Sequence, residues 1–590
     1  MSKSLKTGAA SCVLLFVLAA CNQSTPPPSL KPKPKSLSPA SAAWLRQSNA
    51  FIEEYMLARP SFAVQAGRHE FDGQLPDLSA HGIKREIARL HDQRDQISAV
   101  DPTTLESRER FDRAYLLAVL DKDLFWIEKT QFPFSNPGWY LDQIDPDVYL
   151  SRNYAPLNVR MKAYIKYARG IPRIATAIKE NLKSPLPKTY VELGIAQFGG
   201  LADFYTKNVS AVFAAVSDPD LQKQMSDADT NAAAAMNALK DYLVAERKKA
   251  NDKYAFGPDL FAQMVKQTEQ VDLSVDKIEA AGRADLDRNT AALKAECNTY
   301  APKATLAQCV AKMAANKPKA GPVEEARNQL KALKEFIVQN NVVSIPGSDE
   351  ALVAEAPPYN RSNAAFINTA GPYDKGVAST YNIAPPDPKW SKAEQASYIP
   401  GEAALLFTSV HEVWPGHFLQ FLHSNANPDK LEALWVGYAF AEGWAHYCEE
   451  MMIEMGLGRG DSEKHIGQLS EALLRDVRLL STIGLHTHGM TVAASEKMFR
   501  EQAFQDPGNA RQQAARGTYD PAYLNYTLGK LMIRKLRADW LAKGAAAGSA
   551  PPSAEAMGRW HEFHDKFLSY GGPPIPLLRK ELVGEGGDLL

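Results

Sequence analysis

The sequence predicts a mainly α-helical protein with one small β segment. Apolar residues recur at the i, i+3, i+4 spacing of amphipathic helices through most of the chain after residue 40. Strand signals are confined to a few short runs between residues 341 and 383. The composition, 45% hydrophobic and 23% charged over 590 residues, is ordinary for a globular protein with a large core. With a formal net charge of -1 and scattered Lys and Arg, no nucleic-acid partner is expected.

Residues 1–20 have the pattern of a lipoprotein signal peptide. Two lysines precede an apolar run over residues 12–20, which is too short to span a bilayer as a helix. The run ends in Leu-Ala-Ala-Cys21, which resembles the lipobox of bacterial lipoproteins and implies lipidation of Cys21. The alternative is an ordinary signal peptide cleaved after Ala20. By resemblance to Gram-negative sorting rules, Asn22 implies an outer-membrane lipoprotein that faces the periplasm.

Residues 21–40 are rich in Pro, Lys and Ser, a composition that buries no core, and they are predicted to be a tether. Residues 41–590 are predicted to form a single helical domain, because no long Gly/Ser/Pro-rich break divides them. Its second part, residues 341–590, carries the candidate site. Helical periodicity extends over residues 45–57, 83–97, 107–127, 159–183, 232–249, 271–296 and 310–340.

Three short runs between turn residues predict a small sheet or meander ahead of the candidate site. They cover residues 341–346, 364–368 and 379–383. Just before them, Cys297 and Cys309 flank a turn that contains proline. In an oxidising compartment such a pair is predicted to form a disulfide, the alternative being two free thiols too far apart to bridge.

The segment from His411 to His417 reads His-Glu-Val-Trp-Pro-Gly-His and is typical of a zinc site. A catalytic zinc ion takes about three protein ligands, and the two histidines are the first candidates. In a regular helix, six residues turn through ~600° and leave the two side chains roughly 120° apart. Both can bind one ion only if the helix breaks near Pro415 and Gly416. The alternative is that His411 binds alone and His417 contacts substrate or another ligand.

A second motif, Glu-Gly-Trp-Ala-His-Tyr-Cys-Glu over residues 442–449, supplies the third ligand. Glu442, His446 and Glu449 follow one another at i, i+4 and i+7, so they share one helix face. Glu442 is predicted to bind the metal, and Glu449 to accept a hydrogen bond from a ligating histidine. His446 is the competing candidate for the second imidazole ligand.

Catalytic roles are predicted for three further residues. Glu412 follows His411 directly and points another way, which suits a general base that takes a proton from the attacking water. The alternative is a surface carboxylate. Tyr526 or His488 is predicted to stabilise the oxyanion of the attacked carbonyl. A core tyrosine is the alternative for Tyr526.

Arg475 and Arg478 lie on one helical face downstream of these motifs. Arg478 is predicted to hold a carboxylate of a peptide substrate, whereas a salt bridge is the alternative for Arg475. His486 is predicted either to line the pocket or to pack in the core.

These motifs resemble those of a large bacterial family known as a domain of unknown function, whose hallmarks are HExxPGH and EGWAxYxE. The resemblance extends over residues 41–590 and includes the candidate residues downstream of the motifs. It implies a lipoprotein with a metallopeptidase-like helical fold, similar to the carboxypeptidase Taq and thimet oligopeptidase group of zinc peptidases. In that group the third ligand is a glutamate on a following helix, comparable to Glu442. Ser481 departs from the pattern, since relatives often carry an acid there.

Together the motifs predict zinc-dependent hydrolysis of short peptides in the cell envelope. The expected partners are a peptide substrate and, through the lipid anchor alone, a membrane. One alternative is hydrolysis of a non-peptide amide such as a cell-wall fragment. The other is a non-catalytic metal-binding envelope lipoprotein.

Overall fold

The computed structural model describes residues 37–356, 361, 364–388, 390–543, 554–584 and 586–590. The predicted signal peptide, the predicted lipidation site Cys21 and residues 22–36 of the predicted tether lie outside the described residues. The described part consists mainly of α-helices with one small sheet, which confirms the predicted fold class. None of the helices described has both the length and the apolar character needed to cross a bilayer.

The first helices surround a core of aromatic side chains, and several of them begin at a residue whose side chain caps the helix. At the start of α3, for example, the hydroxyl of Ser79 accepts a hydrogen bond from the backbone N–H of Gly82. The elements in this part are α1 (Pro39–Ala58), α2 (Pro60–Gln65), η1 (His69–Phe71), α3 (Ala80–Ser98), η2 (Pro102–Thr104), α4 (Ser107–Leu124), the π-helical turn η3 (Phe125–Lys129), α5 (Phe132–Ser135), η4 (Pro137–Gln143) and α6 (Asp147–Ser151).

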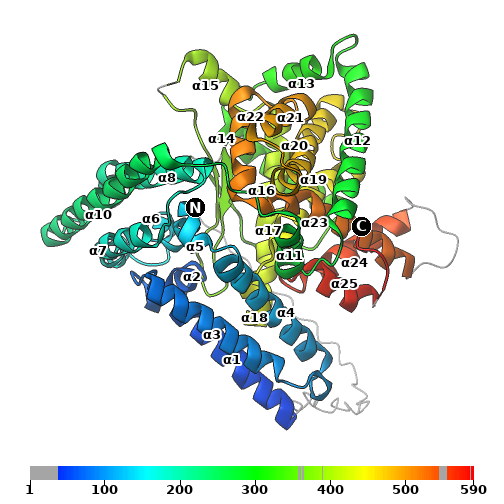
Figure 1. Cartoon of the computed structure of the whole chain (residues 1–590). Helices are drawn as coiled ribbons and strands as arrows, with labels where there is room; N and C mark the ends of the chain where they lie inside the picture. Colours follow the sequence, from blue (N-terminus) through cyan, green and yellow to red (C-terminus); the bar gives the residue numbers. More distant parts are fainter. Residues whose placement is uncertain (1–36, 357–360, 362–363, 389, 544–553, 585) are drawn as a thin grey trace, which may run out of the picture.

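The long helix α10 packs against both α7 and α8, and the three helices project from one side of the molecule (Figure 1). Their neighbours in the chain lead toward the sheet. The elements are α7 (Leu157–Asn181), α8 (Lys188–Lys207), α9 (Val209–Val212), α10 (Pro219–Glu246), η5 (Arg247–Lys249), α11 (Pro258–Glu269), α12 (Val275–Tyr300), α13 (Leu306–Ala315) and α14 (Pro322–Gln339).

Six of the seven stretches with predicted helical periodicity fall largely within helices, although α1 begins six residues and α10 thirteen residues before the predicted starts. The prediction of continuous helix over residues 310–340 is wrong, because α13 and α14 are separate helices. Gly321 has a φ of 86° and Pro322 opens the next helix, so the chain turns at this point. The predicted disulfide between Cys297 and Cys309 is present and joins the end of α12 to α13.

The sheet has three strands in the order β1-β3-β2, from β1 (Leu352–Glu355), β2 (Ala365–Asn368) and β3 (Thr380–Ile383). β1 runs parallel to β3, and β2 runs antiparallel to it. The predicted strand at residues 341–346 is wrong. Val342 is buried, but its carbonyl accepts a hydrogen bond from His564 Nδ1 at 2.7 Å, and Ser344 N–H donates to Asp565 Oδ1 at 2.8 Å. This backbone therefore bonds to side chains of a helix instead of a strand.

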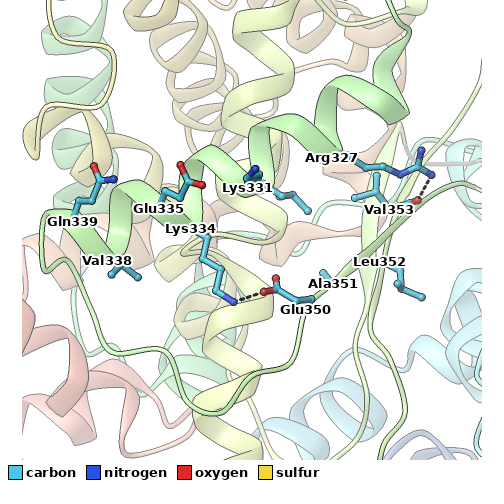
Figure 2. Close-up of a pocket in the computed structure, with 11 residues that line it drawn as sticks. Arg327, Lys331, Lys334, Glu335, Val338, Gln339, Glu350, Ala351, Leu352 and Val353 are labelled. Carbon is cyan, nitrogen blue, oxygen red and sulfur yellow. Dashed lines mark hydrogen bonds and ion pairs between the residues drawn. The ribbon is translucent and has the colours of Figure 1, made fainter. Parts of the chain in front are cut away.

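A cavity of about 660 Å³ lies between α14 and β1 (Figure 2). Lys334 of α14 points across it toward Glu350, and Arg327 donates to the carbonyl oxygen of Val353 at 2.9 Å. The Lys334 ammonium also lies 5.2 Å from the ring centroid of Trp414. These contacts hold the sheet beside α14, which packs on α16 (Glu402–Glu412).

Among the remaining helices, α20 packs along α12 and α19 packs on α23 (Figure 1). One continuous cluster of buried hydrophobic side chains extends from Trp44 to Leu582; the division into domains stays a prediction. The elements are α15 (Lys392–Tyr398), α16 (Glu402–Glu412), α17 (His417–Ala426), α18 (Lys430–Leu434), α19 (Tyr438–Glu454), α20 (Ser462–Thr487), α21 (Val492–Gln502), α22 (Pro507–Tyr519), η6 (Pro521–Leu524), α23 (Asn525–Lys543), α24 (Ala554–Leu568) and α25 (Ile575–Val583).

A buried ion-pair network joins these central helices. Lys530 of α23 is fully buried, and its ammonium contacts Asp285 of α12 and Glu450 of α19. Burial opposes the charge on Lys530, but the carboxylates outweigh burial and raise its pKa above the usual range. Because an unpaired charge in this position would be costly, the network fixes α12, α19 and α23 relative to one another.

Candidate metal centre

The helix that carries His411 is broken where the Pro-Gly pair predicts a break. α16 ends at Glu412 and α17 begins at His417. The N–H of Gly416 donates to the carbonyl oxygen of Val410 at 2.9 Å, and a Cβ on Gly416 would lie 1.8 Å from the carbonyl oxygen of His411. Only glycine fits so close to the preceding turn. The tight turn brings His417 back toward His411 despite the six-residue spacing.

The rings of His411 and His417 converge with the carboxylate of Glu442. The two ring centroids lie 4.8 Å apart at an interplanar angle of 88°. Glu442 Oε2 lies 3.2 Å from His411 Nε2 and 3.4 Å from His417 Nε2. One ligand atom from each residue lies within 4.8 Å of the other two, so this metal-ligand cluster could hold a metal ion. α16, α17 and α19 each contribute one of its members.

Glu449 holds the His411 ring in place from behind. Its Oε1 accepts a hydrogen bond from His411 Nδ1 at 2.7 Å, so Nε2, which faces Glu442, is the nitrogen that the ring would offer to a metal after loss of one proton. The same oxygen lies 3.1 Å from Arg475 Nη2, and Oε2 lies 3.3 Å from His446 Nδ1. His446 therefore lies behind Glu449 and is not among the converging ligands.

The acidic groups of the centre are ionised. Burial would raise the pKa of Glu442, but His417 and His411 outweigh burial and lower it well below its usual range. Burial opposes charge on His411 as well, yet hydrogen bonds to Glu442 and Glu449 raise its pKa to about 9. The Arg475 charge similarly lowers the pKa of buried Glu449. Ionised Glu442 thus offers the metal-ligand cluster one negatively charged donor group.

Two glycines let α19 and α23 approach each other closely. A Cβ on Gly443 would lie 2.6 Å from the Cα of Gly529, and a Cβ on Gly529 would lie 2.1 Å from the carbonyl oxygen of Ala439. This contact brings Tyr526, one turn before Gly529, beside the metal-ligand cluster. Its ring centroid lies 6.3 Å from that of His411 at an interplanar angle of 17°. Burial raises the pKa of the Tyr526 hydroxyl, so it keeps its proton.

Three arginines surround the ring of Tyr526. Arg475 and Arg516 each form an ion pair with a carboxylate, which for Arg475 agrees with the salt-bridge alternative. Arg478 is buried and donates through Nε to the amide oxygen of Gln513 at 2.8 Å, and within the described part of the chain no carboxylate pairs with it. Its positive charge is therefore left for a ligand.

Glu412 carries a free carboxylate next to the metal-ligand cluster. Its side chain is partly exposed, and no described residue forms a hydrogen bond or ion pair with it. Consecutive helical residues differ by about 100°, so Glu412 and His411 leave α16 in different directions. A carboxylate without a partner at this position is free to exchange protons with a bound molecule.

The structure does not bring the two remaining predicted residues to the metal-ligand cluster. At about 1.5 Å per residue, His486 and His488 lie about 12 and 15 Å beyond Arg478 along α20. His486 is buried between a backbone N–H at 3.2 Å and a backbone carbonyl at 2.8 Å. The His488 side chain is 48% exposed and lies 2.9 Å from Glu279. Neither ring contacts the metal-ligand cluster, so we assign no chemical role at the cluster to His486 or His488.

Sequence reasoning missed a polar group beside Tyr526. Tyr438 donates its hydroxyl hydrogen to Asp520 at 3.2 Å, accepts a hydrogen bond from Arg516 at 3.0 Å, and its ring centroid lies 5.8 Å from that of Tyr526. Tyr438, Arg516 and Asp520 line part of a cavity of about 1570 Å³. The other walls of this cavity come largely from the first 143 residues and α8. Tyr438 lies four residues before Glu442 on one helix face, a spacing that could have identified it.

The fold has counterparts in known proteins. Residues 60–582 match the model of a family described as bacterial protein of unknown function, DUF885. A solved structure from Shewanella oneidensis, described as a candidate lipoprotein of unknown function, has a TM-score of 0.74 at 23% identity and covers 91% of this chain and 99% of its own. A candidate lipoprotein from Colwellia psychrerythraea has a TM-score of 0.76 at 16% identity and covers 92% and 99%.

The chain therefore belongs to the DUF885 family and shares its fold with these two proteins. A search of curated proteins found no significant match. A candidate oligoendopeptidase F from Bacillus anthracis str. Ames has a TM-score of 0.28 at 12% identity, over 85% of this chain and 93% of its own, which is too low to show a shared fold. The resemblance to the thimet oligopeptidase group stays a prediction.

Proposed function

We propose that this protein is a zinc-dependent hydrolase that cleaves peptide bonds in short peptides. The observation that carries the proposal is the convergence of His411, His417 and Glu442 from three helices on one point. Two imidazole nitrogens and one carboxylate oxygen are a common donor set of catalytic zinc, which keeps a further position for water or substrate.

The spacing of the ligand atoms fits zinc. Zinc binds nitrogen and oxygen at about 2.0–2.2 Å, so neighbouring ligand atoms of a tetrahedral site lie about 3.4 Å apart. The separations from Glu442 Oε2 to the histidine nitrogens are 3.2 Å and 3.4 Å. The hydrogen bond from His411 Nδ1 to Glu449 also leaves Nε2, the nitrogen that faces Glu442, free to bind.

Zinc, when bound, supplies a Lewis acid that polarises the scissile carbonyl group. Glu412 is the proposed general base: its unpaired carboxylate takes a proton from the attacking water and delivers it to the amine that leaves. The tight turn at Gly416 positions this carboxylate, because it fixes the end of the helix that carries both Glu412 and His411.

Tyr526 and Arg478 are proposed to bind the substrate. The Tyr526 hydroxyl donates a hydrogen bond to the oxygen that becomes negative during attack on the carbonyl group. Arg478 binds a free carboxylate of the peptide, since its guanidinium has no carboxylate partner among the described residues and lies 4.7 Å from the Tyr526 ring centroid. A peptide with a free carboxyl end near the scissile bond would satisfy both groups.

The proposed place of action is the bacterial cell envelope. The Leu-Ala-Ala-Cys21 sequence supports lipidation of Cys21, and two proteins of the same fold are described as candidate lipoproteins. Asn22 supports an outer-membrane anchor with the folded part in the periplasm. The cavity of about 1570 Å³ beside Tyr438 has room for a short peptide, which agrees with a substrate of that class.

The test is Glu412→Gln in purified protein. This variant should retain one zinc ion per chain by mass spectrometry and lose at least about 100-fold in cleavage of a peptide library. Glu402→Gln, at the start of the same helix, is the matched control and should cleave like wild type. Stoichiometric zinc in wild type without cleavage of any library peptide would exclude peptide hydrolysis and favour a metal-binding protein or a hydrolase of another amide.

A further inference from the structure

A second group of carboxylates meets where α4 packs near α18, outside the metal centre. Asp112 comes from α4, Asp429 caps the N-terminus of α18, and Glu432 lies one turn into that helix. One ligand oxygen from each residue lies within 4.8 Å of the other two. Asp112 lies more than 300 residues before Asp429 and Glu432, so the fold assembles this acidic triad from two separate helices.

Two members of the acidic triad are buried without enough donors. Asp112 is 4% exposed and Glu432 is fully buried. Asp112 Oδ1 and Glu432 Oε1 have no hydrogen-bond partner among the described residues. A buried carboxylate oxygen without a donor costs several kcal/mol, so such oxygens are nearly always paired or bound to a metal. These two oxygens therefore indicate that a ligand is needed between the helices.

The nearby cation compensates only part of the charge. Arg108 contacts Glu432 Oε2, and Asn427 Nδ2 donates to the same oxygen at 2.6 Å. The Arg108 side chain is 42% exposed, and its guanidinium lies 4.4 Å from the ring centroid of Tyr570. One arginine thus faces three carboxylates. Arg108 and Asn427 both bind Oε2 of Glu432, and neither of these contacts reaches Oε1.

We propose that Asp112, Asp429 and Glu432 form a binding site for a calcium ion. The donors are all carboxylate oxygens without His or Cys, which favours a hard cation over zinc. Calcium accepts carboxylates in a flexible geometry, with one or both oxygens of each group bound. Magnesium demands a near-ideal octahedron and keeps several of its waters, which a buried set of three carboxylates suits less well.

The calcium ion would tie α4 to the segment that leads into the metal centre. Tyr115, one turn beyond Asp112 on α4, donates its hydroxyl hydrogen to the carbonyl oxygen of Trp435. Trp435 lies between α18 and α19, and α19 carries Glu442. The site would therefore hold the start of α19 against the N-terminal helices. This inference does not depend on hydrolysis, because it concerns other residues and another ion.

The experiment is calcium titration of the full chain by isothermal calorimetry, after metal depletion and reloading with one equivalent of zinc. One calcium ion should bind per chain, and calcium at 100 times its dissociation constant should raise the folding equilibrium constant about 100-fold. Magnesium should bind more weakly. Absence of calcium binding by wild type would overturn the proposal, and equal affinity for magnesium would overturn the choice of ion.

Variants separate the site from the metal centre. Asp112→Asn should abolish calcium binding yet be at least as stable as wild type without calcium, because burial and the neighbouring Asp429 already disfavour a charge on Asp112 and raise its pKa to about 7. Arg108→Gln should tighten binding at least about fivefold, since a competing cation is lost. Glu442→Gln should leave calcium binding unchanged. Calcium affinity that falls in Glu442→Gln but not in Asp112→Asn would place the ion at the other centre and refute the assignment.

Discussion

Glu449 determines which nitrogen of His411 faces the metal-ligand cluster. An ionised carboxylate only accepts hydrogen bonds, so its 2.7 Å contact requires the proton on Nδ1 and makes Nε2 the nitrogen that would lose its proton to bind a metal. The same carboxylate forms an ion pair with Arg475, which forms a second ion pair with Glu471. One buried side chain thus sets the protonation of a metal ligand and compensates a buried guanidinium.

Replacement of Glu449 by Gln should weaken zinc binding about 10- to 100-fold, because residues behind a metal ligand contribute by about that factor. The affinity can be measured by competition with a chromophoric chelator. Glu471→Gln, on the other side of Arg475, is the control and should keep the affinity of wild type. Equal affinities in all three proteins would show that Glu449 does not orient His411.

At the scale of elements, the approach of α19 to α23 places Tyr526. Gly529→Ala would put a methyl group 2.1 Å from the carbonyl oxygen of Ala439, and backbone atoms cannot move aside cheaply. We expect a loss of about 1–3 kcal/mol in the free energy of unfolding, measured with urea.

Gly200→Ala is the matched control for that substitution. Gly200 lies within α8, and a Cβ there would meet nothing within 4 Å. Alanine at an exposed helical position should be neutral or stabilise by up to about 1 kcal/mol. If both variants unfold at the same urea concentration as wild type, the contact between α19 and α23 has room for an added methyl group, which would contradict this prediction.

The helices and the break in the candidate site could be predicted because their signals are local. Periodicity identified most of the long helices that precede the sheet, and Pro415 with Gly416 predicted the break between α16 and α17. The strand prediction failed at Val342, where β-branched side chains fill the core but the backbone bonds to a neighbouring helix. Contacts between distant positions, such as Arg478 with Gln513, have no local signal.

At the scale of the whole molecule, His486 joins three separate segments. Its Nδ1 accepts from the N–H of Phe256 at 3.2 Å, and its Nε2 donates to the carbonyl oxygen of Gly517 at 2.8 Å. A neutral ring satisfies both bonds, whereas a protonated ring loses the first. Burial accordingly lowers the pKa of His486 to about 4.

This pKa predicts a contribution to acid sensitivity. Because the unfolded chain binds the proton at a pKa near 6.5 and the folded chain near 4, stability falls as the pH drops through this interval. The loss attributable to His486 should approach about 3 kcal/mol. Urea unfolding at pH 7.5 and pH 4 measures it.

His486→Gln keeps a donor toward Gly517 and does not titrate, so its stability should change less between the two pH values than that of wild type. His488→Gln, at an exposed position two residues away, should retain the full change. A change of equal size in His486→Gln and wild type would assign the acid sensitivity to other groups.

The cavity beside Tyr438 and the metal-ligand cluster come from different parts of the chain. The walls of the cavity come largely from the first 143 residues and α8, whereas His411, His417 and Glu442 lie within 32 consecutive positions, from 411 to 442. Under the proposed function, selectivity and reactivity would therefore be encoded separately. A protein engineer could reshape the walls, or exchange the N-terminal helices between relatives, and leave the reactive centre intact.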